Sequence, residues 1–304
     1  MNVPTISVLM STYNETAKEL DESICSILGQ SYSDFEFLII NDNPSNDELT
    51  VQLQNYDDNR IRIIKNKENM GLVKSLNQGL QLARGKYIAR MDADDVSKPT
   101  RLKDELLYLQ ENNLDMIGSF VETIDENDKV IKSVMKFPVK NNEIVRFMRW
   151  GSCICHPSWF LKKQVYSTLQ GYRMAPHCED YDFILRAIFH GYKVGNIPKV
   201  ELSYRIRQSG VSKSNEAEQF LLRDFLAKNM KKIDKITEEE IEWFLHSGKF
   251  DAQLSQLTRY KEIKQNLKKQ KDIKNIEAAL LVPANYFFWR DIVEKTTLFV
   301  REHL

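Results

Sequence analysis

Short apolar runs alternate with amphipathic stretches along the first hundred residues of the chain. Nearly continuous apolar runs occupy residues 5–11, 35–40, 61–64 and 87–91. Runs of this length are typical of strands that are buried on both faces of a parallel sheet. Apolar residues at helical spacing lie between these runs, in residues 20–28, 47–56 and 72–83. The alternation predicts a doubly wound α/β sheet, with ligand-binding loops at the carboxyl ends of its strands.

The pattern of strands and helices continues to residue 204. Further strands are predicted over residues 116–124, 130–135, 194–197 and 200–204. Helices are predicted over residues 102–112, 143–148 and 183–190, and one more is predicted to end near residue 169. Gly85 lies just beyond the helix over residues 72–83, at a position suited to a helix C-cap.

From residue 215 onward the strand pattern stops. The remaining residues are rich in Lys, Glu, Leu and Ile, and helices are predicted over residues 216–233, 238–245, 252–269, 271–281 and 283–302. We therefore predict an α/β domain over residues 1–214 and an all-α extension over residues 215–304.

Composition and charge exclude several classes of protein. The chain has 43 basic and 43 acidic residues among 304, so its charge gives no reason to expect nucleic acid as a partner. It contains no run of about 18 apolar residues that could span a membrane. Residues 1–4 lack the basic and apolar regions of a signal peptide. These features predict a cytoplasmic protein.

The cysteines are expected to be reduced in that compartment. Cys153, Cys155 and Cys178 have His156 and His177 as neighbours in the sequence, which raises the possibility of a zinc site. Their spacing is not that of a zinc finger or zinc ribbon, so we interpret them as buried thiols.

Acidic residues are concentrated directly after the strand over residues 87–91. Asp92 and Asp94 lie on one side of the backbone if the strand remains extended, because side chains alternate with a period of two. Two carboxylates about 4 Å apart repel by roughly 4 kcal/mol at an effective dielectric constant near 20, so a cation or water must separate them. Oxygen ligands suit Mn²⁺ or Mg²⁺. The alternative is a solvated acidic turn before the helix that begins near Pro99.

Polar residues also follow the first two strands, at the same predicted edge of the sheet. Thr12–Glu15 follow the first strand and Asp42 follows the second, so the three clusters together predict a site. Glu179–Asp182 open the helix over residues 183–190. The helix dipole favours acidic residues in a first turn, so a purely structural role for that group remains open.

Several motifs occur in a characteristic order along the chain. They are Ser11-Thr12-Tyr13-Asn14, Ile39-Ile40-Asn41-Asp42, Asn69-Met70-Gly71-Leu72, Arg90-Met91-Asp92-Ala93-Asp94-Asp95, His156-Pro157-Ser158 and Glu179-Asp180-Tyr181-Asp182. Their order and spacing resemble the family 2 glycosyltransferases. The resemblance covers about residues 5–214 and implies the GT-A fold, a doubly wound mixed sheet flanked by helices. The helices after residue 214 carry no part of it.

The resemblance implies a nucleotide-sugar donor, most often a UDP-sugar, and inversion at the anomeric carbon. Asp94 would ligate Mn²⁺ or Mg²⁺, Asp92 would approach the metal or the ribose, and Asp180 would act as the general base. The implied nucleotide contacts are Thr12, Tyr13, Asn14, Glu15, Asp42 at the base ring, Asn69, Lys74, Arg90, Asp92 and Ala93. His156 and Glu179 are assigned to the acceptor side, with a hydrogen-bonded structural role for His156 as the alternative.

The chain departs from the family pattern in two loops. Many relatives have Asp-Asp-Gly-Ser where this chain has Asn41–Ser45, so the glycine is missing and the loop shape differs. Relatives often carry a histidine that completes the metal shell at the position of Arg207. Arginine cannot ligate a metal, but it pairs with a diphosphate through two parallel hydrogen bonds. We expect Arg207, or Arg205, to bind the leaving group, and the metal to have one protein ligand fewer; a solvated basic loop is the alternative.

The function implied is transfer of a sugar to a glycan or polyprenyl-linked saccharide in bacterial surface polysaccharide synthesis. One alternative is a nucleotidyltransferase, although Ser11–Asn14 lacks the glycines of a phosphate loop. Another is a non-catalytic nucleotide-sugar binder, which would be expected to have lost an acidic residue.

The C-terminal helices are predicted to pack on the α/β domain or to form a homodimer. Basic residues 261–274 and aromatic residues 286–290 also allow peripheral contact with the inner face of the plasma membrane.

Overall fold

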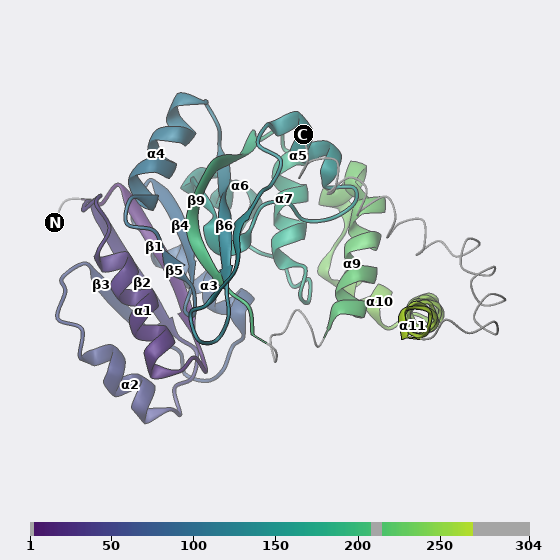
Figure 1. The fold of residues 1–304 in the computed structure, drawn as a ribbon. Helices are drawn as coiled ribbons and strands as arrows, with labels where there is room; N and C mark the ends of the chain where they lie inside the picture. Colours follow the sequence, from purple (N-terminus) through teal and green to yellow (C-terminus); the bar gives the residue numbers. More distant parts are fainter. Residues whose placement is uncertain (1–2, 208–214, 270–304) are drawn as a thin grey trace.

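Strands from the whole α/β region join in one mixed sheet (Figure 1). The computed structural model describes residues 3–207 and 215–269, and side chains as far as residue 262. The strands are β1 Ile6–Thr12, β2 Phe35–Asn41, β3 Ile61–Lys65, β4 Tyr87–Asp92, β5 Val96–Ser97, β6 Met116–Ile124, β7 Val130–Met135, β8 Phe160–Lys162 and β9 Val194–Arg205.

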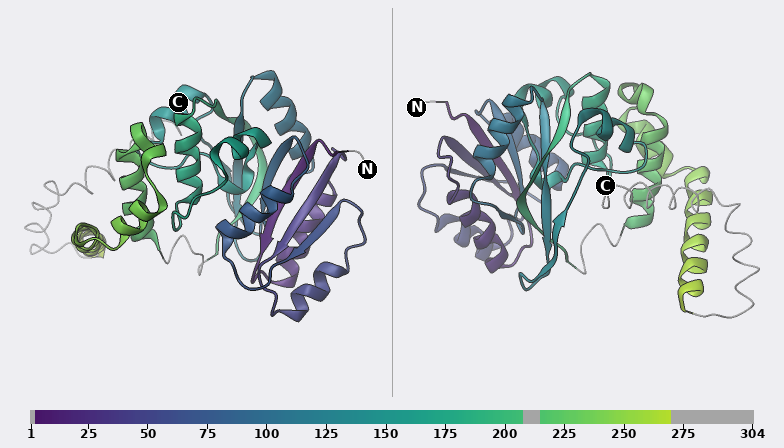
Figure 2. Two further views of the ribbon diagram at one scale, coloured as in Figure 1. Left: turned by 180° about the vertical axis from the view of Figure 1, so that it is seen from behind. Right: turned by 45° about the horizontal axis from the view of Figure 1, so that its top comes forward.

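Helices flank this sheet and extend beyond it (Figure 2). The α-helices are α1 Ala17–Leu28, α2 Asp47–Gln54, α3 Leu72–Leu82, α4 Arg101–Glu111, α5 Asn141–Phe147, α6 Lys163–Leu169, α7 Glu179–Phe189, α9 Glu216–Lys228, α10 Glu238–Leu245 and α11 Gly248–Lys269. Two short 3₁₀ helices are η1 His156–Ser158 and η2 Met230–Lys235.

The strand order is β3-β2-β1-β4-β8-β6-β9-β5, with β7 paired to β6. β1 lies parallel to β2 and β4, and β2 lies parallel to β3. β8 is antiparallel to both β4 and β6, and β6 is parallel to β9. The first four strands therefore end at a common edge, which brings the loops after β1, β2 and β4 together.

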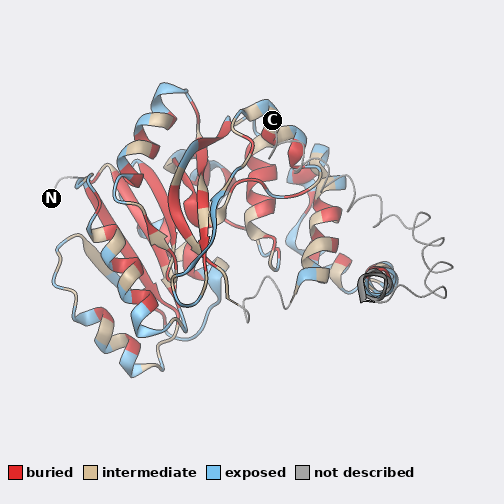
Figure 3. Cartoon of the chain, viewed as in Figure 1, coloured by how far each residue is buried: buried red, intermediate tan, exposed pale blue. Residues whose placement is uncertain are grey.

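The sheet has a hydrophobic core on each face, because successive side chains of its central strands point to opposite sides. Val8 and Met10 of β1 face α1, α2 and α4, whereas Leu9 faces α3, α6 and α7. Figure 3 shows the central strands buried between these helices. Each fully buried aliphatic side chain contributes about 1.5–3 kcal/mol relative to an exposed one.

The predicted mixed α/β sheet with a helical C-terminal region is confirmed, but several details differ. The helix predicted over residues 216–233, for example, is divided into α9 and η2. Residues 194–205 form one strand instead of two, because exposed Pro198 and Lys199 bulge out where the β6–β9 register shifts. β5 and β8 were not predicted, since two or three residues are too few to show a periodicity. β8 nevertheless connects the two halves of the sheet.

Gly85 is not the predicted helix cap. α3 ends at Leu82 and its C-cap is Ala83. A Cβ atom at Gly85 would lie 2.5 Å from the backbone nitrogen of Ser7 in β1, and the Gly85 amide donates a hydrogen bond of 2.8 Å to the Ser7 hydroxyl. Glycine is needed here for a close approach of two backbones.

The described C-terminal helices pack beside α7. Leu222 and Leu226 of α9 and Ile233 of η2 belong to the same hydrophobic cluster as Phe183 and Ile184 of α7. None of the described helices is both long and apolar enough to cross a membrane. The helices predicted over residues 271–281 and 283–302, most of basic segment 261–274 and aromatic segment 286–290 lie outside the residues whose side chains are described.

All four cysteines are free thiols, and Cys153 and Cys178 are buried as predicted for the group around His156. Cys155 is partly exposed. Among the described residues, neither the cysteines nor the histidines form a group that could hold a metal.

We predict that Gly85→Ala lowers the free energy of unfolding by about 1–3 kcal/mol, because the added methyl group overlaps the β1 backbone. The matched control is Gly248→Ala at the start of α11, where a Cβ atom meets nothing within 4 Å. That control should be neutral or stabilising by up to about 1 kcal/mol. Urea unfolding of both variants measures the difference, and equal stabilities would contradict the prediction.

Candidate active site

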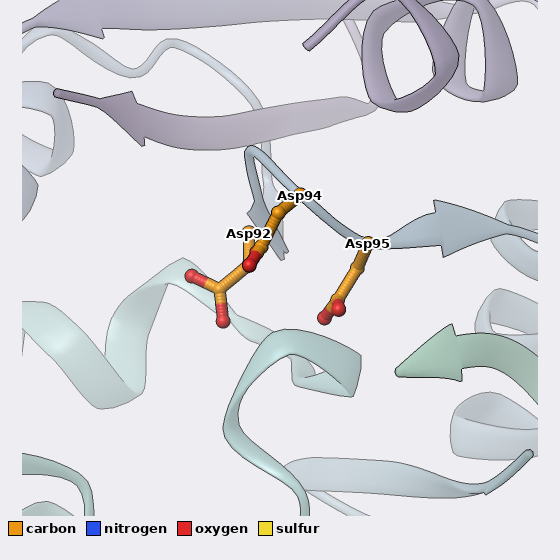
Figure 4. Close-up of side chains that lie close together, drawn as sticks. All are labelled: Asp92, Asp94 and Asp95. Atoms are coloured by element: carbon orange, nitrogen blue, oxygen red, sulfur yellow. The ribbon is translucent and has the colours of Figure 1, made fainter. Parts of the chain in front are cut away.

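Three carboxylates lie at the carboxyl end of β4, as the sequence predicted. Asp92 ends the strand, Asp94 lies in the turn that follows, and Asp95 precedes β5. One carboxylate oxygen from each lies within 4.8 Å of the others. Figure 4 shows all three side chains on the same side of the β4–β5 turn. The alternative of a solvated turn is therefore wrong for Asp95, which is fully buried.

The electrostatics of this cluster favour a cation. Burial and the neighbouring Asp92 raise the pKa of Asp94 to about 7. Burial, together with Asp94 and Asp92, also raises the pKa of Asp95 well above its usual range. The Oδ2 atom of Asp95 is buried and has no hydrogen-bond partner within the described part of the chain. An unpartnered oxygen among three carboxylates suits a hard divalent ion such as Mn²⁺ or Mg²⁺, so the residues present fit the predicted metal.

Contacts from other elements hold the acidic turn in place. The Arg205 backbone amide donates to Asp95 Oδ1 at 2.8 Å, and the Ser23 hydroxyl of α1 donates to the Asp92 carbonyl at 2.8 Å. The buried Arg101 guanidinium donates to the Arg90 carbonyl at 2.8 Å. The backbone of the turn and the Asp95 carboxylate are thus held by the protein itself, which lowers the cost of ordering a site.

Arg207 lies beside the cluster, where the diphosphate residue was predicted. Its Nε atom is 3.0 Å from Asp94 Oδ2, and its Nη2 atom donates to Glu19 Oε2 at 2.9 Å. Its side chain is 22% exposed. A partly exposed guanidinium at this position is accessible to a ligand.

Arg205, the other predicted diphosphate residue, lies inside an internal network. Its side chain is only 1% exposed. It donates to the Asp94 carbonyl at 2.7 Å, to Glu22 at 3.0 Å and to Asp128 at the β6–β7 turn at 2.6 Å. Because its donors are already engaged, Arg205 acts as a connector between α1, the acidic turn and the hairpin.

The loop after β1 faces the acidic cluster. The Thr12 hydroxyl and the Tyr13 amide donate to Glu15 Oε2 at 2.7 and 2.9 Å. The negative charge of Glu15 contributes to the raised pKa of Asp94, so the two carboxylates are close enough to interact. The side chains of Tyr13 and Asn14 are exposed. The predicted nucleotide loop thus lies next to the predicted metal ligands.

Asp42 is buried at the end of β2, and its carboxylate orders the neighbouring turn. It accepts hydrogen bonds from the Met70 amide at 2.8 Å, the Gly71 amide at 2.9 Å and the Asn66 side chain at 2.7 Å. Asn69 and Lys74, the nucleotide contacts predicted nearby, are both exposed. Asp42 has a structural role that the sequence did not predict; its contact with the base ring stays a prediction.

The missing glycine of the β2 loop is replaced by side-chain contacts. Asn43 donates from its side chain to the Tyr13 carbonyl at 2.9 Å, and its amide donates to Asn41 Oδ1 at 2.9 Å. The loop is therefore anchored to the predicted nucleotide loop.

Glu179 and Asp180 lie in the first turn of α7 and face the same region. Burial raises the pKa of Asp180, against a hydrogen bond from the Tyr181 amide of 2.6 Å. Burial and Asp180 raise the pKa of Glu179 to about 7, and Asp92 adds to this shift. Burial raises the pKa of the Cys155 thiol, and the negative charges of Asp95, Asp92 and Asp180 raise it further. Cys155 therefore lies within electrostatic range of both acidic groups.

Arg90 and His156 lie beneath these acids. The buried Arg90 guanidinium pairs with Asp92. Burial and the charge of Arg90 hold the pKa of His156 well below its usual range, so the ring is neutral. His156 Nε2 is 2.8 Å from the Tyr172 hydroxyl, which contacts the Tyr166 hydroxyl at 2.8 Å. These contacts fit the alternative interpretation of His156, in which the ring is hydrogen-bonded and has a structural role. Ala93 is buried in the turn between the acids.

Sequence reasoning missed Glu19 and Arg101. Glu19 forms a capping box with Thr16 at the start of α1, and it also accepts a hydrogen bond from Arg207. The sequence pattern of a capping box accounts for this glutamate, so nothing in the sequence indicates the second contact. Arg101 follows Pro99 at the start of α4, where a basic residue carries no signal of burial. Only the tertiary structure reveals either role.

A mixed sheet with acidic side chains at the ends of its parallel strands is, in this chain, a GT-A fold. The chain belongs to glycosyl transferase family 2, whose model, described as "Glycosyl transferase family 2", matches residues 7–169. The protein is accordingly a glycosyltransferase.

Individual relatives agree with this assignment. An uncharacterized glycosyltransferase of Methanocaldococcus jannaschii, MJ1057, is 39% identical over 209 residues, which cover 68% of this chain and 72% of that protein. The O-antigen biosynthesis glycosyltransferase WbnJ of Escherichia coli is 36% identical over 231 residues, 73% of this chain and 89% of that one. S. aureus TarS 1–349, solved with UDP-GlcNAc, has the same fold, with a TM-score of 0.60 and 16% identity over 86% of this chain and 81% of that chain.

We predict that Arg205→Lys and Arg207→Lys differ in their effect on stability. Lysine keeps the positive charge, but its ammonium group cannot reproduce the hydrogen bonds that the buried Arg205 guanidinium donates to several partners. Arg205→Lys should therefore lower the free energy of unfolding by about 2 kcal/mol or more. Arg207→Lys, at a more exposed position, should change stability by less than about 0.5 kcal/mol. Chemical denaturation measures both, and equal losses would show that Arg205 is not the connector.

Proposed function

We propose that the chain transfers a sugar from a UDP-sugar to a glycan hydroxyl, with inversion and with the help of a divalent cation. The observation that carries this proposal is the cluster of Asp92, Asp94 and Asp95 at the end of β4, with a second acidic pair, Glu179 and Asp180, within electrostatic range of it. The UDP-GlcNAc bound by TarS, which shares the fold, supports a UDP-sugar donor. Family membership favours this activity over nucleotide transfer.

The leaving group is a nucleoside diphosphate, and negative charge grows on its phosphate as the sugar departs. Asp94 and Asp92, with the unpartnered oxygen of Asp95, would hold a cation that neutralises this charge as a Lewis acid. Arg207 adds a fork of donors for the same phosphate oxygens. To do so it releases Asp94, which the cation would then neutralise. Thr12, Tyr13, Asn14, Glu15 and Asp42 surround the nucleoside.

Asp180 takes the proton of the acceptor hydroxyl. The acceptor oxygen forms its bond to the anomeric carbon on the face opposite the diphosphate, while the bond from that carbon to the phosphate oxygen breaks. One displacement without a covalent intermediate inverts the centre, as in inverting hydrolysis with an alcohol in place of water. The raised pKa of Asp180 suits a base that works near neutral pH. Glu179 precedes this base in the chain, and the positive charge of Arg90 favours the ionised form of Asp180.

The acceptor is a saccharide of a bacterial surface polysaccharide, free or polyprenyl-linked, on the cytoplasmic side of the membrane. The O-antigen role in the printed name of WbnJ supports this class of acceptor. Residues 1–214 form the catalytic domain in this proposal, and residues 215–304 the extension.

We predict that Asp180→Asn lowers the rate of transfer by about 10²–10⁴-fold, the usual contribution of a general base. Affinity for UDP with Mn²⁺ should stay within about twofold, because Asp180 does not contact the nucleotide. A panel of UDP-sugars with Mn²⁺, assayed by UDP release to water or to added saccharides, provides the rate, and calorimetry provides the affinity. Asp94→Asn is the contrasting variant, since it should lose Mn²⁺-dependent UDP binding. Full turnover by Asp180→Asn would refute the assignment of the base.

We also predict that, at saturating Mn²⁺, the rate falls as the pH drops, with an inflection above the value near 4 that is usual for an aspartate. Asp180 accepts a proton only when ionised, and burial raises its pKa. The residual rate of Asp180→Asn should lack this inflection. An inflection that persists in this variant would show that another group controls the profile.

A further inference from the structure

The segment that leads into the catalytic first turn of α7 has an unusual backbone. His177 has a φ of +60°, in the left-handed region that non-glycine residues rarely adopt. Such a conformation is strained and persists only where neighbouring structure enforces it. Cys178, the N-cap of α7, makes no side-chain capping bond. The side chain of the N-cap residue therefore does not hold the start of this helix.

Gln219 of α9 supplies the missing contacts. Its side-chain amide donates a hydrogen bond of 2.7 Å to the His177 carbonyl. Its backbone carbonyl accepts a hydrogen bond of 3.3 Å from the Cys178 thiol. One residue of the C-terminal helices thus binds both residues that precede Glu179, and Figure 1 shows α9 beside α7.

Other C-terminal residues hold the beginning of the same segment. The Met174 amide donates to Glu238 Oε1 at 2.8 Å. Arg173 donates to the Ile236 carbonyl, and its Nε atom donates to Asp182 of α7 at 3.1 Å. The segment 173–178 is therefore held at both ends by residues beyond the α/β region.

Arg223 lies one turn after Gln219 on α9, at the spacing that places two side chains on the same face of a helix. Its positive charge lowers the pKa of the Asp180 carboxyl and of the Cys178 thiol, whereas burial raises both. The described charged and titratable groups that act on Asp180 or respond to it are Glu179, Arg90, Arg223, Cys155 and Cys178.

We propose that α9 completes the active site, with Gln219 as the positioning residue that holds the first turn of α7 toward the acceptor, and with Arg223, on the same face of α9, as a cation that favours the ionised base. This inference rests on the proposed role of Asp180 as the base. It gives the C-terminal helices a part in catalysis, in addition to packing.

The position of the loop is tested with Gln219→Ala in the full-length chain. Without the amide donor, the amides of residues 174–181 should exchange with deuterium at least about tenfold faster. With an active UDP-sugar, kcat should fall about 10-fold or more while KM for the donor stays within about twofold. Glu218→Gln, an exposed neighbour on α9, is the matched control and should change neither quantity. Unchanged exchange in Gln219→Ala would overturn the proposal, whether or not a donor has been found.

The charge of Arg223 is tested by titrating ¹³C-labelled aspartates by NMR. Arg223→Gln should raise the pKa of Asp180, because a nearby cation is lost, and should move the acidic limb of the rate to higher pH. Arg223→Lys should restore both, whereas Lys228→Gln, later on the same helix, should alter neither. An Asp180 signal, assigned by its loss in Asp180→Asn, that titrates identically in Arg223→Gln would overturn the role of Arg223.

These outcomes are distinct from failure of the proposed function. If no UDP-sugar is turned over, or if Asp180→Asn is fully active, the assignment of the base fails, while exchange and titration still report on α9. If Asp180→Asn is inactive and both α9 variants match the unaltered chain, only the inference about α9 fails. Gln219→Asn serves as the conservative variant if Gln219→Ala does not fold.

Discussion

The mutual repulsion of clustered carboxylates is the constraint on which this structure depends. Asp92, Asp94 and Asp95 meet at one turn, and Glu179 and Asp180 lie nearby at the start of α7. Asp95 is fully buried and the other four are partly buried, which weakens their solvation, and Coulomb repulsion grows as the dielectric constant falls. The raised pKa of Asp94 and of Glu179 records this cost. A site of this kind forms only if cations or protons offset the negative charge.

The fold supplies those cations from separate parts of the chain. Arg90 reaches the cluster from within β4, Arg207 follows the end of β9, and Arg223 extends from α9. Arg205 has a different role, because its donors join α1, the acidic turn and the β6–β7 hairpin from a buried position. The arginines differ in exposure and hence in function. A buried guanidinium whose three nitrogens all donate hydrogen bonds, as in Arg205, holds the surrounding elements together, and a partly exposed one is available to a phosphate.

Much of the fold could be predicted from the sequence, because the continuous apolar runs of β1, β2 and β4 are long enough to show their period. The predicted bounds of β6, β7 and α10 agree with the structure residue for residue. β8 escaped prediction, since three residues carry no period, although it joins the halves of the sheet. For the site, the spacing of Asp92 and Asp94 located the acidic cluster.

The difference between Arg205 and Arg207 could not be predicted from the sequence. Two arginines at the end of the same strand differ only in the residues that pack over them. Gln219 gave no signal either, since its partner is a backbone carbonyl 42 residues away.

The positions of these groups divide the site into two halves with different constraints. The family model matches residues 7–169, which include the acidic cluster, the β1 loop and Asp42. Those residues lie at the ends of parallel strands, and their positions follow directly from the order of the sheet. Glu179, Asp180 and the α9 residues lie beyond that match, and their positions depend on contacts between helices and on a strained turn at His177. Sheet order constrains the half that would bind a nucleotide, the feature that sugar donors of this kind have in common. Under the proposed function, this division would allow the half assigned to the acceptor to vary through its helix contacts, while the order of the sheet keeps the half assigned to the donor, and the balance of charge at β4, unchanged.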